Sequence, residues 1–328
     1  ILDKQVELIC AEIEKDFRKT SPENLVAHRR TATLFRRSHL NTWKKPIDLL
    51  EMFVYMHLEY HEKLYETYHK ERQNNVRFSV LMALHGKALL TSFEILELIK
   101  GGLADGAMGR WRTLYETAII TCFLSKHDAG LAQQFLDYSA VQQYKDALEY
   151  QKNCSKLGYK SFRKREMDRF EQRRNAMVAK YGTKFKSEYG WLLNYLPEPH
   201  NFKSIEDNTS YKHFRSYYKM ANHRVHSGPH TILTSLGSLN ERFWLPAGPS
   251  NFGLADPGKN TAFALQWTSL VLAEDDNYIE TSVFLKLTAK LAKEIAREFL
   301  ETQQRIEEEE TLLQKKQKAK TNKGRKAK

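Results

Sequence analysis

Apolar residues recur three and four positions apart along most of the chain, which is the spacing of helices that bury one face. Between residues 1 and 19 these positions are Val6, Ile9, Ile13 and Phe17. No segment alternates with a period of two, so the pattern predicts an all-α fold, a multi-helix bundle. The predicted helices span residues 1–19, 23–40, 46–74, 78–100, 106–124, 129–152, 160–182, 203–226, 229–236, 260–275 and 277–312.

The two most apolar segments, residues 78–100 and 106–124, follow each other closely in the sequence. The first stops at Gly101-Gly102, and the short sequence GGLADG leads into the second. Helices that are apolar on nearly every side belong inside a protein. We therefore expect a buried helical hairpin at the centre of the bundle.

The domain organisation follows from these segments. We expect a single all-helical domain over residues 1–312, with no repeat of 30–45 residues. It divides into N-terminal helices (1–45), a core bundle (46–236), an irregular loop rich in Gly, Pro, Asn and Ser (237–259) and C-terminal helices (260–312). The remaining residues, 313–328, are lysine-rich and of low complexity, which predicts a disordered basic tail.

The formal net charge of +12 is concentrated in that tail, since residues 314–328 supply eight basic residues and no acid. The basic balance therefore permits RNA as a partner without requiring it. Cys10, Cys122 and Cys154 are scattered, which favours a reducing, cytoplasmic setting over a disulfide framework or a structural zinc site. No apolar run reaches the roughly 20 residues that cross a bilayer, and we predict no membrane segment.

Two charges interrupt the second segment of the hairpin. Arg112 and Glu116 are four residues apart and share one helix face. Burying a charge is costly unless it is paired. Either the two form a structural ion pair, or Glu116 holds Arg112 in place so that its planar guanidinium meets a phosphate.

A histidine cluster follows in YKHFRSYYKMANHRVHSGPH, residues 211–230. Four of the twelve histidines lie within it, close to Arg224. Histidine suits proton transfer near neutral pH, so His226 and His230, on either side of the Gly228-Pro229 break, could line one pocket. The alternative is that these histidines pack in the core or face water.

A metal site is a weaker possibility in the helix predicted over residues 46–74. It contains His57, His61 and one Glu-x-x-His sequence, Glu66 to His69. Di-iron bundles use that motif twice, and this chain has it once, so we expect no metal and no cofactor.

The pairing of GRWRTLYETAII with YYKMANHRVHSGPH resembles a bacterial all-helical family of unknown function. Its members have Arg-x-x-x-Glu on a buried helix and a later Val-His, matched here by Arg112, Glu116 and His226 over residues 50–235. The chain also resembles, more loosely, the HEPN superfamily of helical ribonucleases, whose Arg-x(4–6)-His motif is matched by Arg224 and His230. Chance alone supplies such a spacing in a chain this rich in arginine and histidine.

This resemblance implies a metal-independent, HEPN-like endoribonuclease, the toxin or effector of a bacterial defence system. It would act as a homodimer on RNA, with His226 or His230 handling the proton, and with Arg224 and Arg112 stabilising charge on the phosphate. A partner protein from a defence or toxin–antitoxin system is also implied. The alternative is a non-enzymatic sensor or scaffold module in which Arg112 and Glu116 are structural.

Overall fold

The computed structural model describes residues 2–68, 74–226, 228–237, 247–273 and 278–326, and the side chains of residues 2, 230, 232 and 317–326 lie outside that description. Within these ranges the chain is all-α, with no strand, which confirms the predicted fold class. The helices are α1 (Leu2–Thr42), α2 (Lys44–Tyr68), α3 (Val76–Lys100), α4 (Ala104–Ser125), α5 (Ala129–Asp137), α6 (Ser139–Asn153), α7 (Lys164–Tyr181), α8 (Phe202–Asp207), α9 (Arg215–Val225), α10 (Pro229–Leu233), α11 (Ala255–Leu272) and α12 (Ile279–Lys326).

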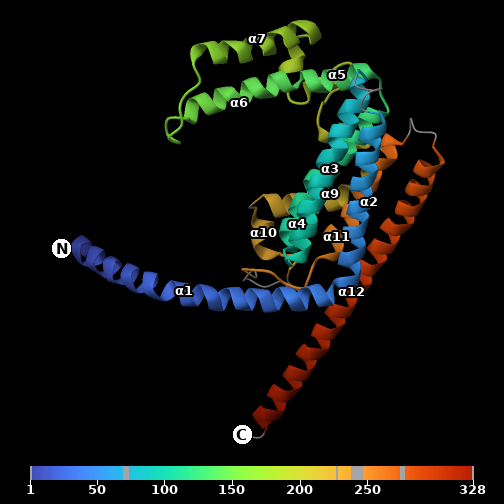
Figure 1. Cartoon of the computed structure of the whole chain (residues 1–328). Helices are drawn as coiled ribbons and strands as arrows, with labels where there is room; N and C mark the ends of the chain where they lie inside the picture. Colours follow the sequence, from blue (N-terminus) through green and yellow to red (C-terminus); the bar gives the residue numbers. More distant parts are fainter. Residues whose placement is uncertain (1, 69–73, 227, 238–246, 274–277, 327–328) are drawn as a thin grey trace.

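The predicted hairpin is present as α3 and α4 (Figure 1). Asn75 caps α3 by accepting a hydrogen bond from the backbone of Phe78 (3.0 Å). Gly102 turns the chain with φ +72°, and a Cβ there would lie 2.7 Å from the carbonyl oxygen of Ser250. Only glycine fits such a backbone at such a close approach. Trp111, at the middle of α4, is fully buried.

Helices α2, α11 and α12 complete the core around this hairpin. α11 contacts α2, α3, α4 and α12, and α12 runs along α2 (Figure 1). α11 is nearly all buried, although it carries many polar residues on its inner positions. α11 begins at Ala255, so the last residues of the loop predicted over 237–259 are helical. Residues 238–246 of that loop lie outside the described residues.

The N-terminal region differs from its prediction. The segments predicted as two helices, residues 1–19 and 23–40, form one helix of 41 residues, α1, which continues through Pro22. A proline inside a helix removes one backbone hydrogen bond, and water can satisfy the freed carbonyl when the helix is exposed. α1 joins the core only near its end, where His39 is buried and one of its ring nitrogens lies 2.8 Å from the carbonyl oxygen of Ile99.

Other helix ends also differ. The segment predicted over residues 129–152 is split at Tyr138 into α5 and α6, and residues 203–226 form α8, a 3₁₀ turn and α9. The backbone of α12 is helical to Lys326, and the disorder predicted for the basic tail over residues 313–328 stays a prediction. Lysine is a good helix former, and the last turns of α12 extend an already formed helix at little cost.

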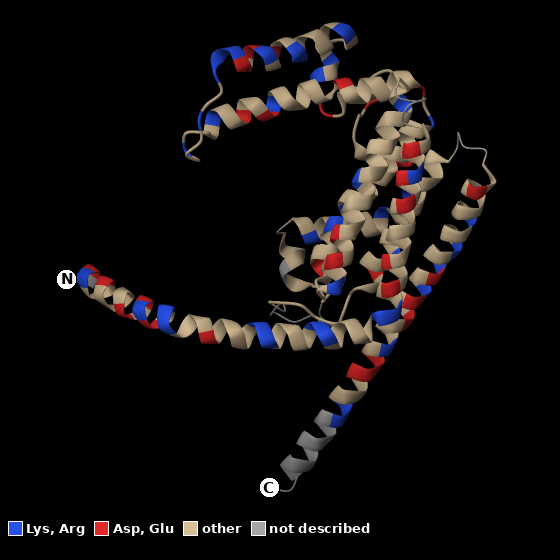
Figure 2. Cartoon of the chain, in the orientation of Figure 1, with Lys and Arg blue, Asp and Glu red and all other residues tan. Residues whose placement is uncertain are grey.

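Two parts of the chain project from the core. α1 stands out on one side, and α6 with α7 forms a hairpin at the far end of α3 (Figure 1). α7 has no buried residue, and basic and acidic side chains are interleaved along it (Figure 2). Among the described helices, α3 is the one long and apolar enough to cross a membrane, and 56% of its apolar window is buried inside the bundle.

The tight contact of α11 with α12 gives a stability prediction. A Cβ on Gly258 would lie 2.5 Å from the buried ring of Phe299. Gly258→Ala should therefore lower the free energy of unfolding by about 1–3 kcal/mol through overpacking, although alanine normally favours a helix over glycine. Urea unfolding measures this. Gly248→Ala, where an added Cβ meets no described atom within 4 Å, is the control and should change little. Equal stability of both variants would contradict the packing described.

Candidate functional site

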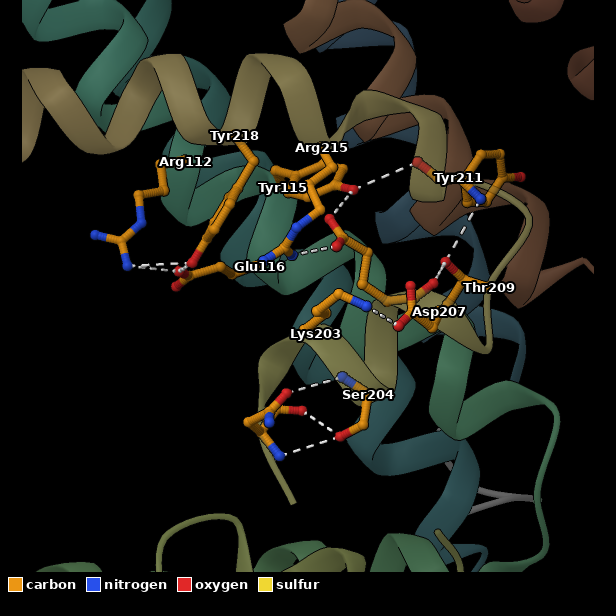
Figure 3. Close-up of polar contacts among 12 residues, drawn as sticks. Arg112, Tyr115, Glu116, Lys203, Ser204, Asp207, Thr209, Tyr211, Arg215 and Tyr218 are labelled. Atoms are coloured by element: carbon orange, nitrogen blue, oxygen red, sulfur yellow. Dashed lines mark hydrogen bonds and ion pairs between the residues drawn. The ribbon is translucent and has the colours of Figure 1, made fainter. Parts of the chain in front are cut away.

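Arg112 and Glu116 lie on α4 and share a third residue, Tyr218, which α9 presents to them (Figure 3). The guanidinium of Arg112 lies 3.1 Å from Glu116 and donates a hydrogen bond to the Tyr218 hydroxyl (3.2 Å). That hydroxyl in turn donates to the Glu116 carboxylate (2.7 Å). The three side chains thus form a closed triangle of charge-assisted contacts, which we call the Arg–Tyr–Glu triangle.

The packing of α9 against α4 explains this position. A Cβ on Gly109 would lie 3.6 Å from Val225, so the end of α9 rests on the first turns of α4. Two helical turns earlier on α9, Tyr218 reaches the face that carries Arg112 and Glu116. Tyr218 is buried, whereas the side chains of Arg112 and Glu116 keep 24% and 33% of their exposure. The triangle therefore lies at the edge of the core, less buried than the apolar sequence of α4 suggests.

The triangle favours one ionisation state. Burial and the hydrogen bond to Glu116 raise the pKa of Tyr218 to about 12, so the hydroxyl stays protonated at neutral pH. Partial burial lowers the pKa of Arg112, but the hydrogen bond to Tyr218 and the charge of Glu116 outweigh it, and the net shift is upward. Both shifts favour a cationic arginine and a neutral tyrosine.

A second polar cluster adjoins the triangle. Tyr115 donates a hydrogen bond to the fully buried Glu206 (2.7 Å), which also pairs with Arg215. Burial is the main reason that the pKa of Tyr115 is raised, followed by the hydrogen bond to Glu206. The Tyr218 ring has a guanidinium near it from each cluster, at 5.2 Å for Arg112 and 5.9 Å for Arg215. Cation–π attraction therefore joins the two clusters.

The geometry of these two clusters suits contacts between helices better than it suits catalysis. Each arginine already has a carboxylate, and each tyrosine hydroxyl is protonated and donates to one. A general base needs a proton acceptor that can reach substrate, and the carboxylate of Glu206 is fully buried. The remaining open group is the part of the Arg112 guanidinium that points away from Tyr218 and Glu116 (Figure 3).

Arg224, a predicted catalytic residue, lies in a different place. Its side chain is 6% exposed and lies 3.2 Å from the carboxylate of Asp105, at the start of α4. It also donates a hydrogen bond to the carbonyl oxygen of Thr234 (2.6 Å). Asp105 accepts a further bond from the backbone of Leu236 (3.1 Å). Arg224 therefore fastens the chain after α10 to the first turn of α4.

His226 ends α9 with its side chain exposed. Eight residues separate it from Tyr218, which is roughly 12 Å along a helix. Among the described residues, the structure gives no hydrogen bond or ion pair between His226 and Arg112 or Glu116. Arg112 and Glu116 contact Tyr218, and the catalytic roles predicted for them and for His226 stay predictions. The backbone of His230 lies in α10, and its side chain lies outside the described residues.

Three histidines, His57 and His61 of α2 and His85 of α3, lie close together where α2, α3 and α11 pack. The sequence indicated only the first two. His57 lies 2.8 Å from the carbonyl oxygen of Phe53 and 3.2 Å from the side-chain oxygen of Gln266. His61 lies 2.9 Å from His85, whose other ring nitrogen lies 2.9 Å from the hydroxyl of Ser269. Burial lowers the pKa of His57 to about 4 and also lowers those of His61 and His85.

Part of this histidine group could be predicted from polar positions in apolar helices. His85, Gln266 and Ser269 are polar positions on the inner faces of very apolar helices, α3 and α11. Which of them would meet cannot be read without the packing of α11 across α3. No group of three His, Cys, Asp or Glu residues in the described part of the chain could hold a metal ion, and His69 lies outside that part.

Comparison with known proteins gives one match. The model of a family described as a family of unknown function (DUF5677) matches residues 78–243, which run from the first turn of α3 past α10. The matched region holds the Arg–Tyr–Glu triangle together with Arg224 and His226. No curated protein matches the chain, and no solved structure matches it.

The buried histidines make the fold sensitive to acid. The pKa of His57 falls from 6.5 to about 4 on folding. The free energy of unfolding that depends on neutral His57 is therefore fully present above pH 6.5 and is lost as the pH falls towards 4. His57→Leu should reduce the stability lost between pH 6.5 and 4 by about 3 kcal/mol at most. His61, His85 and paired carboxylates such as Glu298 should contribute to the rest. Urea unfolding as a function of pH measures this. The exposed His28→Leu is the control, and identical pH profiles for the two variants would contradict the burial of His57.

Proposed function

The chain belongs to the family of unknown function DUF5677, and we propose that it is a non-enzymatic helical scaffold or sensor module in which Arg112 and Glu116 are structural. The observation that carries this proposal is the closure of the Arg–Tyr–Glu triangle. A catalytic arginine needs donors directed at substrate, whereas this arginine is held by a carboxylate and a hydroxyl of its own fold. Arg224 is likewise held by Asp105.

The exposed helices support the same proposal. α1 and the α6–α7 hairpin place long stretches of helix in solvent, far from the core (Figure 1). Exposed helices with apolar or mixed-charge faces are common means of binding other proteins. A cytoplasmic protein of a bacterial defence or toxin–antitoxin system is the partner that the family-like motifs suggest.

The structural role of Arg112 is open to a direct test. Arg112→Ala would leave Glu116 and Tyr218 partly buried without their cation. The expected loss is about 1–2 kcal/mol in the free energy of unfolding, less than for a fully buried pair because the two charges keep part of their hydration. Thermal and urea unfolding measure it. Arg112→Ala/Glu116→Ala should recover part of the loss, because it removes the unpaired carboxylate as well. A single variant as stable as the wild type would refute the structural role.

A second candidate function is the metal-independent ribonuclease. It is favoured by the exposed imidazole of His226 and by the partly exposed guanidinium of Arg112, which lie on neighbouring helices. In such an enzyme the 2′-hydroxyl of RNA would attack the adjacent phosphorus while a histidine takes its proton. The 5′-oxygen would leave with a proton, and an arginine would stabilise the phosphate oxygens. A homodimer would supply histidine and arginine from two chains.

Incubation of the purified protein with total RNA and a chelator separates the two candidates. The scaffold proposal expects no cleavage beyond that of His226→Ala and His230→Ala. The ribonuclease candidate expects cleavage that falls by about 10²–10³-fold when one phosphate-stabilising or proton-transfer group is removed. Metal-independent cleavage lost in these variants would overturn the scaffold proposal, because neither histidine belongs to the triangle.

A further inference from the structure

The first half of α1 carries a row of exposed apolar side chains. Val6, Ile9, Ile13 and Phe17 follow helical spacing and are each between 50% and 65% exposed. Residues three and four apart share one face of a helix, so the four form a continuous apolar stripe. We call this row and its continuation towards residue 31 the α1 stripe.

Nothing else in the described chain covers the α1 stripe. α1 extends away from the core and meets it only near His39 (Figure 1). An isolated helix gains little stability from its own hydrogen bonds, and most helical stability in proteins comes from packing an apolar face. A contiguous exposed apolar row of this kind marks an interaction surface.

The second half of the α1 stripe has small side chains. Thr20, Asn24, Ala27 and Thr31 continue the same face at the same spacing. Large residues therefore occupy the first half and small residues the second. Two such helices fit closely when they run antiparallel, because the half with large side chains then lies along the half with small ones, and only the large residues at the axis meet each other. A parallel pair would place the large residues opposite each other and leave the small ones apart.

Charge favours the same orientation. Residues 2–16 hold five acidic and two basic residues, a net charge of −3. Residues 17–30 hold four basic and one acidic, a net charge of +3 with histidine neutral (Figure 2). An antiparallel pair brings each acidic half beside a basic half, and a parallel pair brings like charges together.

We propose that α1 pairs with α1 of a second copy of this chain as an antiparallel helix pair, with the two-fold axis at Phe17. In this register Phe17 faces Phe17, and position i lies level with position 34 − i of the second copy. The stripe residues nearest in height to Val6 and Ile13 are then Ala27 and Thr20 of the second copy, each within about 1.5 Å along the helix axis. Pro22 lies on the opposite side of the helix from the stripe, so the proline leaves the contact surface intact. The pair lies outside residues 78–243 and does not depend on the proposed function.

Cysteine cross-linking of the full-length chain tests the orientation. The exposed Cys10 is first replaced by serine, and the two buried cysteines stay. Phe17→Cys should then form a disulfide-linked dimer under mild oxidation, because only residues at the axis of an antiparallel pair come within the 4.4–6.8 Å Cα separation that a disulfide needs. Val6→Cys, the matched control, should stay unlinked, and Val6→Cys/Ala27→Cys should link. Cross-linking of Val6→Cys as fast as of Phe17→Cys would show a parallel pair and overturn the proposal.

Dimerisation itself is tested by sedimentation of the uncross-linked chain. Phe17→Asp places two carboxylates at the axis and should raise the dimer dissociation constant at least 100-fold. Its thermal melt, taken at a concentration where the wild type is monomeric, should match the wild type, because the side chain is exposed in one chain. Leu8→Asp is the control, since Leu8 is as exposed but lies away from the α1 stripe. A wild-type chain that stays monomeric, or equal effects of the two substitutions, would overturn the proposal.

Discussion

The hydroxyl of Tyr218 is the contact on which the centre of this protein depends. Most residues of α4 are buried, yet the helix carries the charged side chains of Arg112 and Glu116. A charge at the edge of a core needs a partner. Tyr218 accepts from Arg112 and donates to Glu116, so it satisfies both with one group. It also fixes α9 against the hairpin, and the aromatic ring carries the contact on to Arg215. The site is therefore best understood as a joint between α4 and α9.

The sequence predicted the fold class and the α3–α4 hairpin because both depend on local patterns, namely helical spacing and a Gly-Gly stop. It also paired Arg112 with Glu116, since residues four apart on a helix meet wherever the helix lies. It did not predict Tyr218, because that contact depends on how α9 crosses α4. Tyr218 lies inside the histidine cluster of residues 211–230, where nothing in the sequence distinguishes it from Tyr211 and Tyr217. The break predicted between residues 19 and 23 is absent, because an exposed helix tolerates a proline such as Pro22 that a buried helix would not.

The molecule combines a rigid core with long exposed helices. The core is held by a few polar groups placed among apolar ones: the Arg–Tyr–Glu triangle, the Glu206 cluster and the buried histidines. Their carboxylates and tyrosine hydroxyls are paired within the fold, and such polar networks help to specify one packing arrangement. The exposed helices have the opposite character: the α1 stripe packs against no other part of the described chain, and α7 has no buried residue. We therefore propose that binding uses the exposed helices and that the family-like motif stabilises the core.

A double-mutant cycle on Glu116→Gln and Tyr218→Phe tests the central claim most directly. Tyr218→Phe removes the hydroxyl and keeps the ring, and Glu116→Gln removes the charge and keeps the shape. If the triangle is structural, both substitutions remove the same hydrogen bond, from the Tyr218 hydroxyl to the Glu116 carboxylate. Their effects on the free energy of unfolding should then not add. The coupling free energy should then be about 1 kcal/mol, within the range found for residues in direct contact. Effects that add to within about 0.3 kcal/mol, the behaviour of independent sites, would contradict the account.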